Sequence, residues 1–280
     1  MELNPRNIKQ LKVNLKDDSQ ISLTYLTISN REALISIAND NQQVNINETD
    51  LISGLYEGGL KIWDCSIDLV NYIAKNPELV KGKNVIELGC GQGLPGIICA
   101  THGQAKNLIL QDYNQDVLEN ATQKALDINL QNFGSQTQIE LLPGSWEHLL
   151  NTRQDLQGKF DIVLMSETLY NTQYYDSLFG FIDSILTQNQ ESFVLIGTKT
   201  FYFGLGGGYY EFQKYIEEKW SSKFKVEVIE KLNDMKSIER LILKMRRVSD
   251  MDIVTKDLEF KAQIQGGNSS QSQNDFFLQF

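Results

Sequence analysis

Short apolar runs alternate with helical patterns through the middle of the chain. The apolar runs are mostly bounded by Gly, Asn or Ser, as expected of buried parallel strands, and lie at residues 84–88, 107–112, 138–142, 160–166 and 192–198. Helical patterns precede and separate them, at residues 67–74, 96 onward, 115–126 and 174–186. This alternation predicts an α/β fold with a doubly wound, mostly parallel sheet and helices on both faces.

The pattern continues to residue 245. An amphipathic helix is predicted from residue 209, and two further strands are predicted at residues 225–230 and 239–245. With these two strands, the expected Rossmann-like sheet has seven strands.

Both ends of the chain lose this periodicity. Residues 1–48 are polar and rich in Asn and Gln, with one strand-like alternation at residues 21–25, and predict a partly ordered extension. Residues 247–280 are rich in Gln, Asn, Ser and Gly and predict a disordered or loosely packed tail. The folded domain is therefore expected over residues 49–246.

The composition fits one acidic domain. Of the 280 residues, 41% are hydrophobic, which is enough for a full core. The net charge of -10 argues against direct nucleic-acid binding, which needs basic surface, and favours a cationic or neutral partner; acidity that serves only solubility is the alternative. No apolar run approaches the roughly 18 residues of a membrane span, and the N-terminus lacks the apolar centre of a secretory signal. We expect a monomer in the cytoplasm, with the nucleus as a second location, and no membrane contact.

Cysteine and histidine are few and scattered. Three cysteines, Cys65, Cys90 and Cys99, are an odd number for a disulfide framework, and with the two histidines they show no zinc-like spacing. We therefore expect no metal site and assign the thiols to packing.

The segment "VIELGCGQGLPG" at residues 85–96 is the strongest local signal for a ligand. It matches G-x-G-x-x-G, in which glycines let the backbone approach a dinucleotide pyrophosphate at a helix N-terminus. Glu87, two residues before Gly89, would repel a pyrophosphate but suits a positively charged ligand. S-adenosylmethionine carries an ammonium and a sulfonium and no phosphate, so this turn favours it over a nicotinamide cofactor.

The ends of the next two strands supply groups for a nucleoside. Asp112 lies about 20 residues past the glycines, where a carboxylate can accept hydrogen bonds from both ribose hydroxyls. The pair Ser145 and Trp146 follows the third strand and is placed to receive an adenine. Glu87 or Asp112 alone could also be a turn-capping carboxylate. Together, these residues in this order predict an S-adenosylmethionine-dependent methyltransferase.

The motif order carries a family resemblance. The segments "TDLISGLYEGGLKIWDCSIDL", "VIELGCGQGLPGI", "LQDYN", "PGSWE", "FDIVLMSETLYN" and "TKTFYFGLGGG" resemble the eukaryotic histidine protein methyltransferase 1 family, a branch of the class I, seven-strand methyltransferases. The resemblance covers about residues 49–212. It implies methylation of the distal imidazole nitrogen of a histidine in a large-subunit ribosomal protein, which is a basic partner.

Two departures from the family pattern keep other functions open. Gln92 interrupts the glycine turn, and "SETLY" stands where related lysine methyltransferases tend to carry D-x-x-Y. A protein-lysine methyltransferase on the same scaffold therefore remains an alternative, as does a cofactor-binding protein that docks without catalysing.

The resemblance also implies which residues contact the cofactor. Some of these residues precede the first predicted strand, and the others lie at the ends of the first four strands. The glycine turn would hold the methionine part, the end of the second strand the ribose and the adenine edge, and the residues after the third strand the base. The full set is Ile62, Trp63, Asp64, Cys65, Glu87, Gly89, Gly91, Gly93, Gln111, Asp112, Tyr113, Ser145, Trp146 and Ser166. Trp63 could instead be a core aromatic.

Candidates for orienting the acceptor follow the fourth strand. Methyl transfer from a sulfonium is an in-line displacement, so an enzyme must align a lone pair with the methyl carbon and exclude water. A neutral imidazole, with a reference pKa of about 6.5, needs no strong base, but its other nitrogen should donate its proton to an acceptor. Side chains at this strand end face the reacting group in an open α/β sheet, which selects Glu167, Tyr170 and Asn171. Glu167 as a purely structural residue is the alternative.

Three consecutive glycines lie among aromatic residues in "TKTFYFGLGGGYYEF" at residues 198–212. Glycines at this edge allow close approach of a substrate chain, and aromatic rings can stack on an imidazole. The segment predicts a substrate-binding lip formed by Tyr202, Phe203, Gly206, Gly207 and Tyr209. Alternatively, the aromatic residues pack the following helix and the glycines only make the turn.

Overall fold

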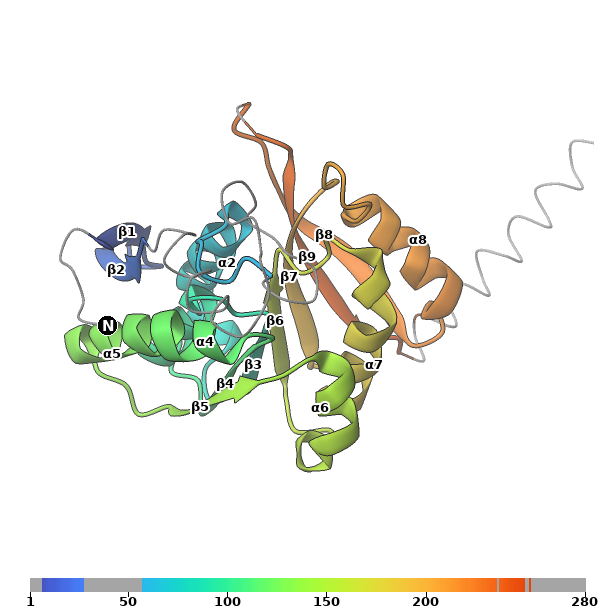
Figure 1. Cartoon of the computed structure of the whole chain (residues 1–280), viewed down its shortest axis with the longest axis horizontal. Helices are drawn as coiled ribbons and strands as arrows, with labels where there is room; N and C mark the ends of the chain where they lie inside the picture. The colour runs from blue at the N-terminus through green and yellow to red at the C-terminus, as the bar shows by residue number, and fades with distance from the viewer. Residues whose placement is uncertain (1–6, 28–56, 236, 250–251, 253–280) are drawn as a thin grey trace, which may run out of the picture.

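A seven-stranded sheet forms the centre of the computed structural model, which describes residues 7–27, 57–235, 237–249 and 252 (Figure 1). Its strand order is β5-β4-β3-β6-β7-β9-β8, with β3 to β7 parallel and β8 and β9 antiparallel to their neighbours. The doubly wound sheet predicted from the sequence is confirmed. The strand bounds are β3 (Asn84–Leu88), β4 (Asn107–Asp112), β5 (Gln138–Pro143), β6 (Ile162–Ser166), β7 (Phe193–Lys199), β8 (Phe224–Leu232) and β9 (Arg240–Arg247).

Helices cover both faces of the sheet because side chains on each strand alternate between two apolar cores. Val85 packs with α2, α3 and α5 on one face, and its neighbour Ile86 packs with α6, α7 and α8 on the other. The helix predicted over residues 115–126 is longer, formed by α4, a π-helical turn (Leu118–Thr122) and α5. The helix bounds are α2 (Asp64–Lys75), α3 (Leu94–Thr101), α4 (Gln115–Val117), α5 (Gln123–Phe133), α6 (Trp146–Thr152), α7 (Tyr175–Ile185) and α8 (Tyr209–Lys219).

The chain order reverses at β3, which has β4 on one side and β6 on the other. At such a switch point the loops after neighbouring parallel strands diverge and leave a crevice at the carboxyl edge of the sheet. The glycine turn, Asp112 and Glu167 therefore all emerge at this edge.

An antiparallel hairpin, β1 (Ile8–Asn14) and β2 (Gln20–Leu26), precedes the sheet and lies beside α2 and α5 (Figure 1). The sequence predicted the second of these strands and missed the first. The first strand buries only Val13, so its residues show little alternation between apolar and polar positions.

The hairpin is attached to the domain by a buried amide. Asn129 of α5 accepts a hydrogen bond from the backbone N–H of Thr24 at 2.9 Å and donates to its carbonyl at 2.8 Å. Leu23 joins the core beneath α2 and α5. Residues 7–27 thus pack on the sheet domain, whereas the rest of the predicted extension, residues 49–56 and nearly all of the predicted tail lie outside the described residues. The domain boundaries stay predictions.

The described ranges contain no helix that is long and apolar enough to cross a membrane, and no group of three His, Cys, Asp or Glu residues that could hold a metal ion. Cys65, Cys90 and Cys99 are buried free thiols, and burial raises the pKa of each.

Candidate active site

A cavity of about 340 Å³ opens where β3, β4 and β6 end. This volume lies within the range of small-molecule sites. Five segments that are distant in sequence line it: residues 57–66, 89–92, 111–113, 144–147 and 166–177. Twelve of the residues predicted for the site form part of the wall: Ile62, Trp63, Gly89, Gly91, Gln111, Asp112, Tyr113, Ser145, Trp146, Ser166, Glu167 and Tyr170.

The glycine turn needs its glycines both for conformation and for space. Gly89, Gly91 and Gly93 have φ of +62°, +53° and +72°, in the left-handed region that disfavours side chains. A Cβ at Gly91 would lie 2.8 Å from the carbonyl oxygen of Gly59, and one at Gly89 would lie 2.8 Å from Cγ2 of Thr168. Gly59 and Thr168 also line the cavity, so a side chain in the turn would displace its walls.

Asp112 presents a buried carboxylate beside this turn. Its Oδ2 accepts a hydrogen bond from the Gly91 N–H at 2.8 Å, and its Oδ1 accepts one from the Asn114 N–H at 3.0 Å. Burial raises its pKa to about 6. Each carboxylate oxygen has a second lone pair, so the group can cap the turn and still accept from the hydroxyls of a bound ribose.

Gln111 fixes an aromatic platform. Its Oε1 accepts from the Trp146 indole N–H at 2.9 Å and from the Gly89 N–H at 3.2 Å, and its Nε2 donates to the carbonyl of Gly144 at 2.8 Å. Ser145 lines the cavity, but its hydroxyl caps α6 by accepting from the N–H of His148 at 3.2 Å. The hydrogen bond to Gln111 therefore fixes the orientation of the Trp146 ring, which can stack on a ligand. The side chains of Gln111 and Ser145 are themselves hydrogen-bonded within the protein.

Glu87 lies behind the glycine turn and outside the cavity wall that the described residues form. It is fully buried, and its Oε2 accepts from the Gly96 N–H in the first turn of α3 at 2.7 Å. Because side chains alternate along a strand, Glu87 shares the face of Val85, which packs toward α3. This placement fits a turn-capping carboxylate. Three other predicted cofactor residues also lie outside the described wall: Asp64, Cys65 and Gly93.

Glu57 is a wall residue that the sequence analysis did not select. Its carboxylate accepts hydrogen bonds from the hydroxyls of Tyr170 and Tyr174, the latter at 3.1 Å. Burial, together with this carboxylate, raises the pKa of Tyr170, which keeps its hydroxyl protonated as a donor. The available signal was an acid directly before Gly58 and Gly59, similar to the acid before the main glycine turn.

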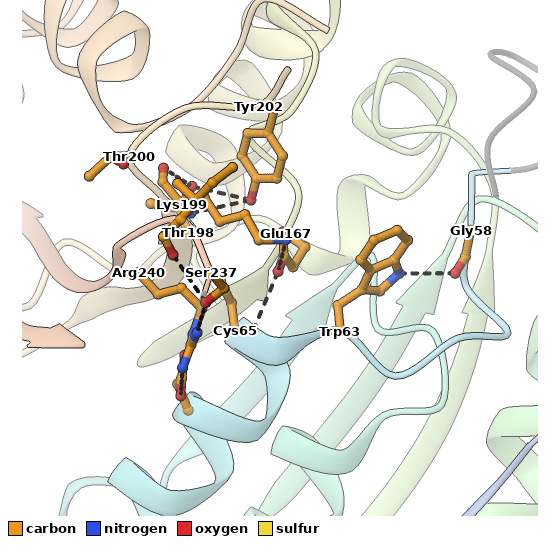
Figure 2. Close-up of polar contacts among 12 residues, drawn as sticks. Gly58, Trp63, Cys65, Glu167, Thr198, Lys199, Thr200, Tyr202, Ser237 and Arg240 are labelled. Atoms are coloured by element: carbon orange, nitrogen blue, oxygen red, sulfur yellow. Dashed lines mark hydrogen bonds and ion pairs between the residues drawn. The ribbon is translucent and has the colours of Figure 1, made fainter. Parts of the chain in front are cut away.

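Trp63 connects the start of α2 to the cavity. Its indole N–H donates to the carbonyl of Gly58 at 3.1 Å (Figure 2). The ring is partly buried and lines the cavity. Trp63 is thus a wall residue that closes the loop from residue 58 to residue 63.

Three contacts hold Glu167 in place. Its side chain accepts from the Cys65 N–H at 3.4 Å and pairs with Lys199, whose Nζ lies 3.0 Å from Oε1 (Figure 2). Its backbone N–H donates to the carbonyl of Gly197 at 3.0 Å. These contacts stabilise a left-handed φ of +56°, which costs a non-glycine residue about 1 kcal/mol. The sequence missed Lys199, although it ends the strand next to β6.

Asn171 does not join Tyr170 on the described wall. Its side-chain oxygen accepts from the N–H of Gln173 at 3.0 Å and caps a short 3-10 helix (Thr172–Tyr174). Its backbone forms an isolated bridge with Gly206. Asn171 therefore supports the segment after β6 and does not face the cavity.

The loop that was predicted as a substrate-binding lip packs against the backbone segment after β6. None of Tyr202, Phe203, Gly206, Gly207 and Tyr209 lines the cavity as the described residues form it. A Cβ at Gly207 would collide with the carbonyls of Leu169 and Tyr170, and the N–H of Gly208 donates to the Leu169 carbonyl at 2.8 Å. The glycines thus let the loop pack directly on the backbone after β6.

The aromatic residues of the lip have two different environments. Tyr202 is partly buried, and its hydroxyl accepts from the Lys199 N–H at 3.4 Å. Phe203, in contrast, is 78% exposed, and Phe201, Leu205 and Tyr210 are also exposed. The Tyr202 ring therefore belongs to the surroundings of Glu167, whereas the other four side chains are exposed to solvent.

Comparison with known proteins gives consistent matches. A family model described as lysine methyltransferase matches residues 24–202. The histidine protein methyltransferase 1 homolog of Dictyostelium discoideum is 39% identical over 172 residues, which cover 61% of this chain and 53% of that protein. The Bos taurus homolog is 32% identical over 269 residues, which cover 86% of this chain and 70% of that protein. The chain thus spans about half the length of the Dictyostelium relative and 70% of the Bos taurus relative.

Solved structures match more distantly. The magnesium protoporphyrin IX methyltransferase of Synechocystis aligns with a TM-score of 0.45 and 16% identity, covering 65% of this chain and 81% of that one. A likeness at this level supports no functional conclusion.

Proposed function

Because the chain belongs to the histidine protein methyltransferase 1 family, we propose that it transfers a methyl group from S-adenosylmethionine to a histidine side chain of a protein. One observation carries the proposal. A single cavity is lined both by the glycine turn with Asp112 and by Glu167 with Tyr170. Groups suited to a nucleoside and groups suited to an acceptor thus share one space, as a transfer reaction requires.

The residues of the cavity fit this cofactor. Among the described wall residues there are four carboxylates and one lysine, so the local field favours a cationic ligand over a pyrophosphate. Asp112 would accept from the ribose hydroxyls, and Trp146, fixed by Gln111, would stack on the adenine. When bound, S-adenosylmethionine supplies an electrophilic methyl group, which a nitrogen lone pair takes as the S–C bond breaks and sulfur keeps its electron pair.

Glu167 supplies the hydrogen-bond acceptor that a histidine substrate needs. Glu167 lines the cavity and its carboxylate is rigidly held, so we assign to it the role of accepting the N–H of the ring nitrogen that does not react. This contact selects the tautomer with a free lone pair on the reacting nitrogen. As that nitrogen becomes bonded to carbon, the ring gains positive charge, and the same carboxylate stabilises the charge and accepts the proton.

The substrate we propose is a large-subunit ribosomal protein, methylated at the distal imidazole nitrogen. Ribosomal proteins are basic, and a net charge of -10 on this chain complements them. We further propose that the protein acts as a monomer in the cytoplasm and the nucleus, without direct contact to nucleic acid.

Labelling of a cell extract tests the proposal. Recombinant protein and methyl-labelled S-adenosylmethionine are added to extract from cells that lack the endogenous enzyme, and labelled proteins are hydrolysed and also mapped by mass spectrometry. We expect methylhistidine at one site of a large-subunit ribosomal protein. Methyllysine as the sole product would instead support the activity named by the matching family model, and cofactor binding without labelling would indicate a non-catalytic docking protein.

A further inference from the structure

Lys199 places a cation against Glu167, a residue of the cavity wall, although Lys199 itself is not one of the described wall residues. It is the last residue of β7, and its Nζ lies 3.0 Å and 3.2 Å from the two carboxylate oxygens of Glu167. Both side chains are shielded, with 15% and 7% of their surfaces exposed. Figure 2 shows this pair between Trp63 and Tyr202.

Two aromatic rings complete the surroundings of the ammonium group. The Nζ of Lys199 is 5.4 Å from the centroid of the Trp63 ring and 5.4 Å from that of the Tyr202 ring. Both distances lie within the range of cation–π attraction. A carboxylate with two aromatic rings is a typical binding site for an ammonium group. In this protein the chain's own lysine occupies that site.

This arrangement distinguishes the two acceptors that the comparisons leave open. A lysine substrate would bring a second ammonium group toward Glu167, where Lys199 repels it at short range in a shielded environment. It must also lose a proton to solvent before its lone pair can take the methyl group. A neutral imidazole carries no charge and can donate its N–H to the Glu167 carboxylate without meeting this repulsion.

We infer that Lys199 determines acceptor specificity: by occupying the cation site formed by Glu167, Trp63 and Tyr202, it excludes lysine and admits histidine. The inference rests on the proposed function and adds to it. Lys199 acts on the substrate through Glu167 and through its own charge, and it takes no part in the transfer of the methyl group.

The substitution Lys199→Met tests the inference, because it keeps the length of the side chain and removes its charge. With labelled S-adenosylmethionine and extract lacking the endogenous enzyme, we expect methylhistidine alone from the wild type. From Lys199→Met we expect methyllysine as well, with a rise of about tenfold or more in the ratio of methyllysine to methylhistidine. Lys199→Arg keeps the cation and should keep the wild-type ratio.

Lys223→Met is a matched control. Lys223 also pairs with a carboxylate, Asp183 at 2.5 Å, and lies over an aromatic ring, Trp220 at 5.1 Å. Neither Asp183 nor Trp220 lines the described cavity wall, whereas Glu167 and Trp63, which contact Lys199, do. The activity of Lys223→Met and its ratio of methyllysine to methylhistidine should equal those of the wild type.

Two results would overturn the inference in a Lys199→Met protein that has normal thermal stability and cofactor affinity. One is an unchanged product ratio. The other is loss of all methyl transfer, which would mean that Lys199 only positions Glu167. If Lys199→Met does not fold, Lys199→Gln makes the same comparison. Methyllysine as the product of the wild-type protein would refute the proposed function itself. The wild-type sample alone tests this, so the two failures can be told apart.

Discussion

Asp112 and Glu87 are both buried carboxylates beside the glycine turn, but only Asp112 faces the cavity. Asp112 ends β4 and holds the backbone of Gly91, so the same side chain shapes the turn and offers free lone pairs to a ligand. Glu87 lies within β3, and its side chain accepts a hydrogen bond from the Gly96 N–H in the first turn of α3. Their roles therefore differ, and separate measurements should distinguish them.

Replacing Asp112 with Ala should weaken S-adenosylmethionine binding at least about tenfold, because both the ribose acceptor and the tether of Gly91 are lost. Isothermal titration calorimetry measures the affinity. Asp116→Ala, an exposed acid four residues later, should bind like the wild type. Unchanged affinity of Asp112→Ala would remove this residue from the cofactor site.

The burial of Glu87 predicts a pH dependence of stability. Burial raises its pKa to about 8 in the folded protein, from an ordinary value of 4.5. Between these values the unfolded chain is ionised while the folded protein keeps the proton, so stability present below pH 4.5 is lost as pH rises toward 8. The loss is at most about 1.4 kcal/mol per pH unit.

Urea denaturation of the cofactor-free protein at several pH values measures this loss. Glu87→Gln has no charge to bury, so its free energy of unfolding should fall less than that of the wild type over the same range. Comparing the two proteins separates Glu87 from Asp112, whose raised pKa acts in the same direction. Parallel curves would mean that Glu87 is ionised in the folded protein.

At the scale of elements, Gln92 joins three parts of the chain. Its Oε1 accepts from the Leu26 N–H at 2.8 Å, and its Nε2 donates to the carbonyls of Leu26 and Leu60, both at 2.7 Å. The side chain is 1% exposed. This residue therefore connects the hairpin, the glycine turn and the loop that carries Glu57 and Trp63, which accounts for an amide in the middle of the turn.

Gln92→Ala should lower the free energy of unfolding by about 2–3 kcal/mol, because it removes three buried hydrogen bonds to the backbone of Leu26 and Leu60. It should also weaken cofactor binding, since the loop from Gly58 loses its attachment. Chemical denaturation and calorimetry measure the two effects. Gln213→Ala, an exposed glutamine of α8, should change stability by no more than about 0.5 kcal/mol. Wild-type stability of Gln92→Ala would mean that the hairpin is held by its apolar contacts.

The glycine loop after β7 acts on the acceptor end through the backbone. Gly207→Val should displace residues 169–170 and reduce protein methylation about tenfold or more, with a smaller change in cofactor affinity. Gly206→Val is the matched comparison, because a Cβ there has open space and only its φ of +77° is unfavourable. Its loss of activity should be smaller. Equal losses of methylation and cofactor binding in Gly207→Val would show that the loop supports the whole domain.

At the scale of the whole molecule, the order of strands brings the site together. β3 lies between β4 and β6, so the segments that follow these three strands meet although they are up to about eighty residues apart. The loop before α2 covers them, and the hairpin holds that loop through Gln92. The strand order of the sheet therefore creates the cavity. Its wall carries more carboxylates than lysines, as the whole chain carries more acidic than basic residues.

The sequence by itself determined the seven strands of the central sheet, their order along the chain and the positions of the glycine turn, Asp112, Trp146 and Glu167, whereas β1 and α6 were not predicted. The predicted features follow from patterns within a few residues: the two periods of hydrophobicity, the glycines, and the polar residues at strand ends. Parallel strands then place such ends at one edge, so even the meeting of these residues was predictable.

Only the tertiary structure decided how those residues pair. Glu57 reaches Tyr170 across 113 positions, Leu26 reaches Gln92 across 66, and Lys199 reaches Glu167 across 32. The direction of Glu87, away from the cavity, was likewise decided by packing against α3. Such contacts depend on distances between elements and not on local pattern, and for this reason the specificity of the site lay outside what the sequence alone could show.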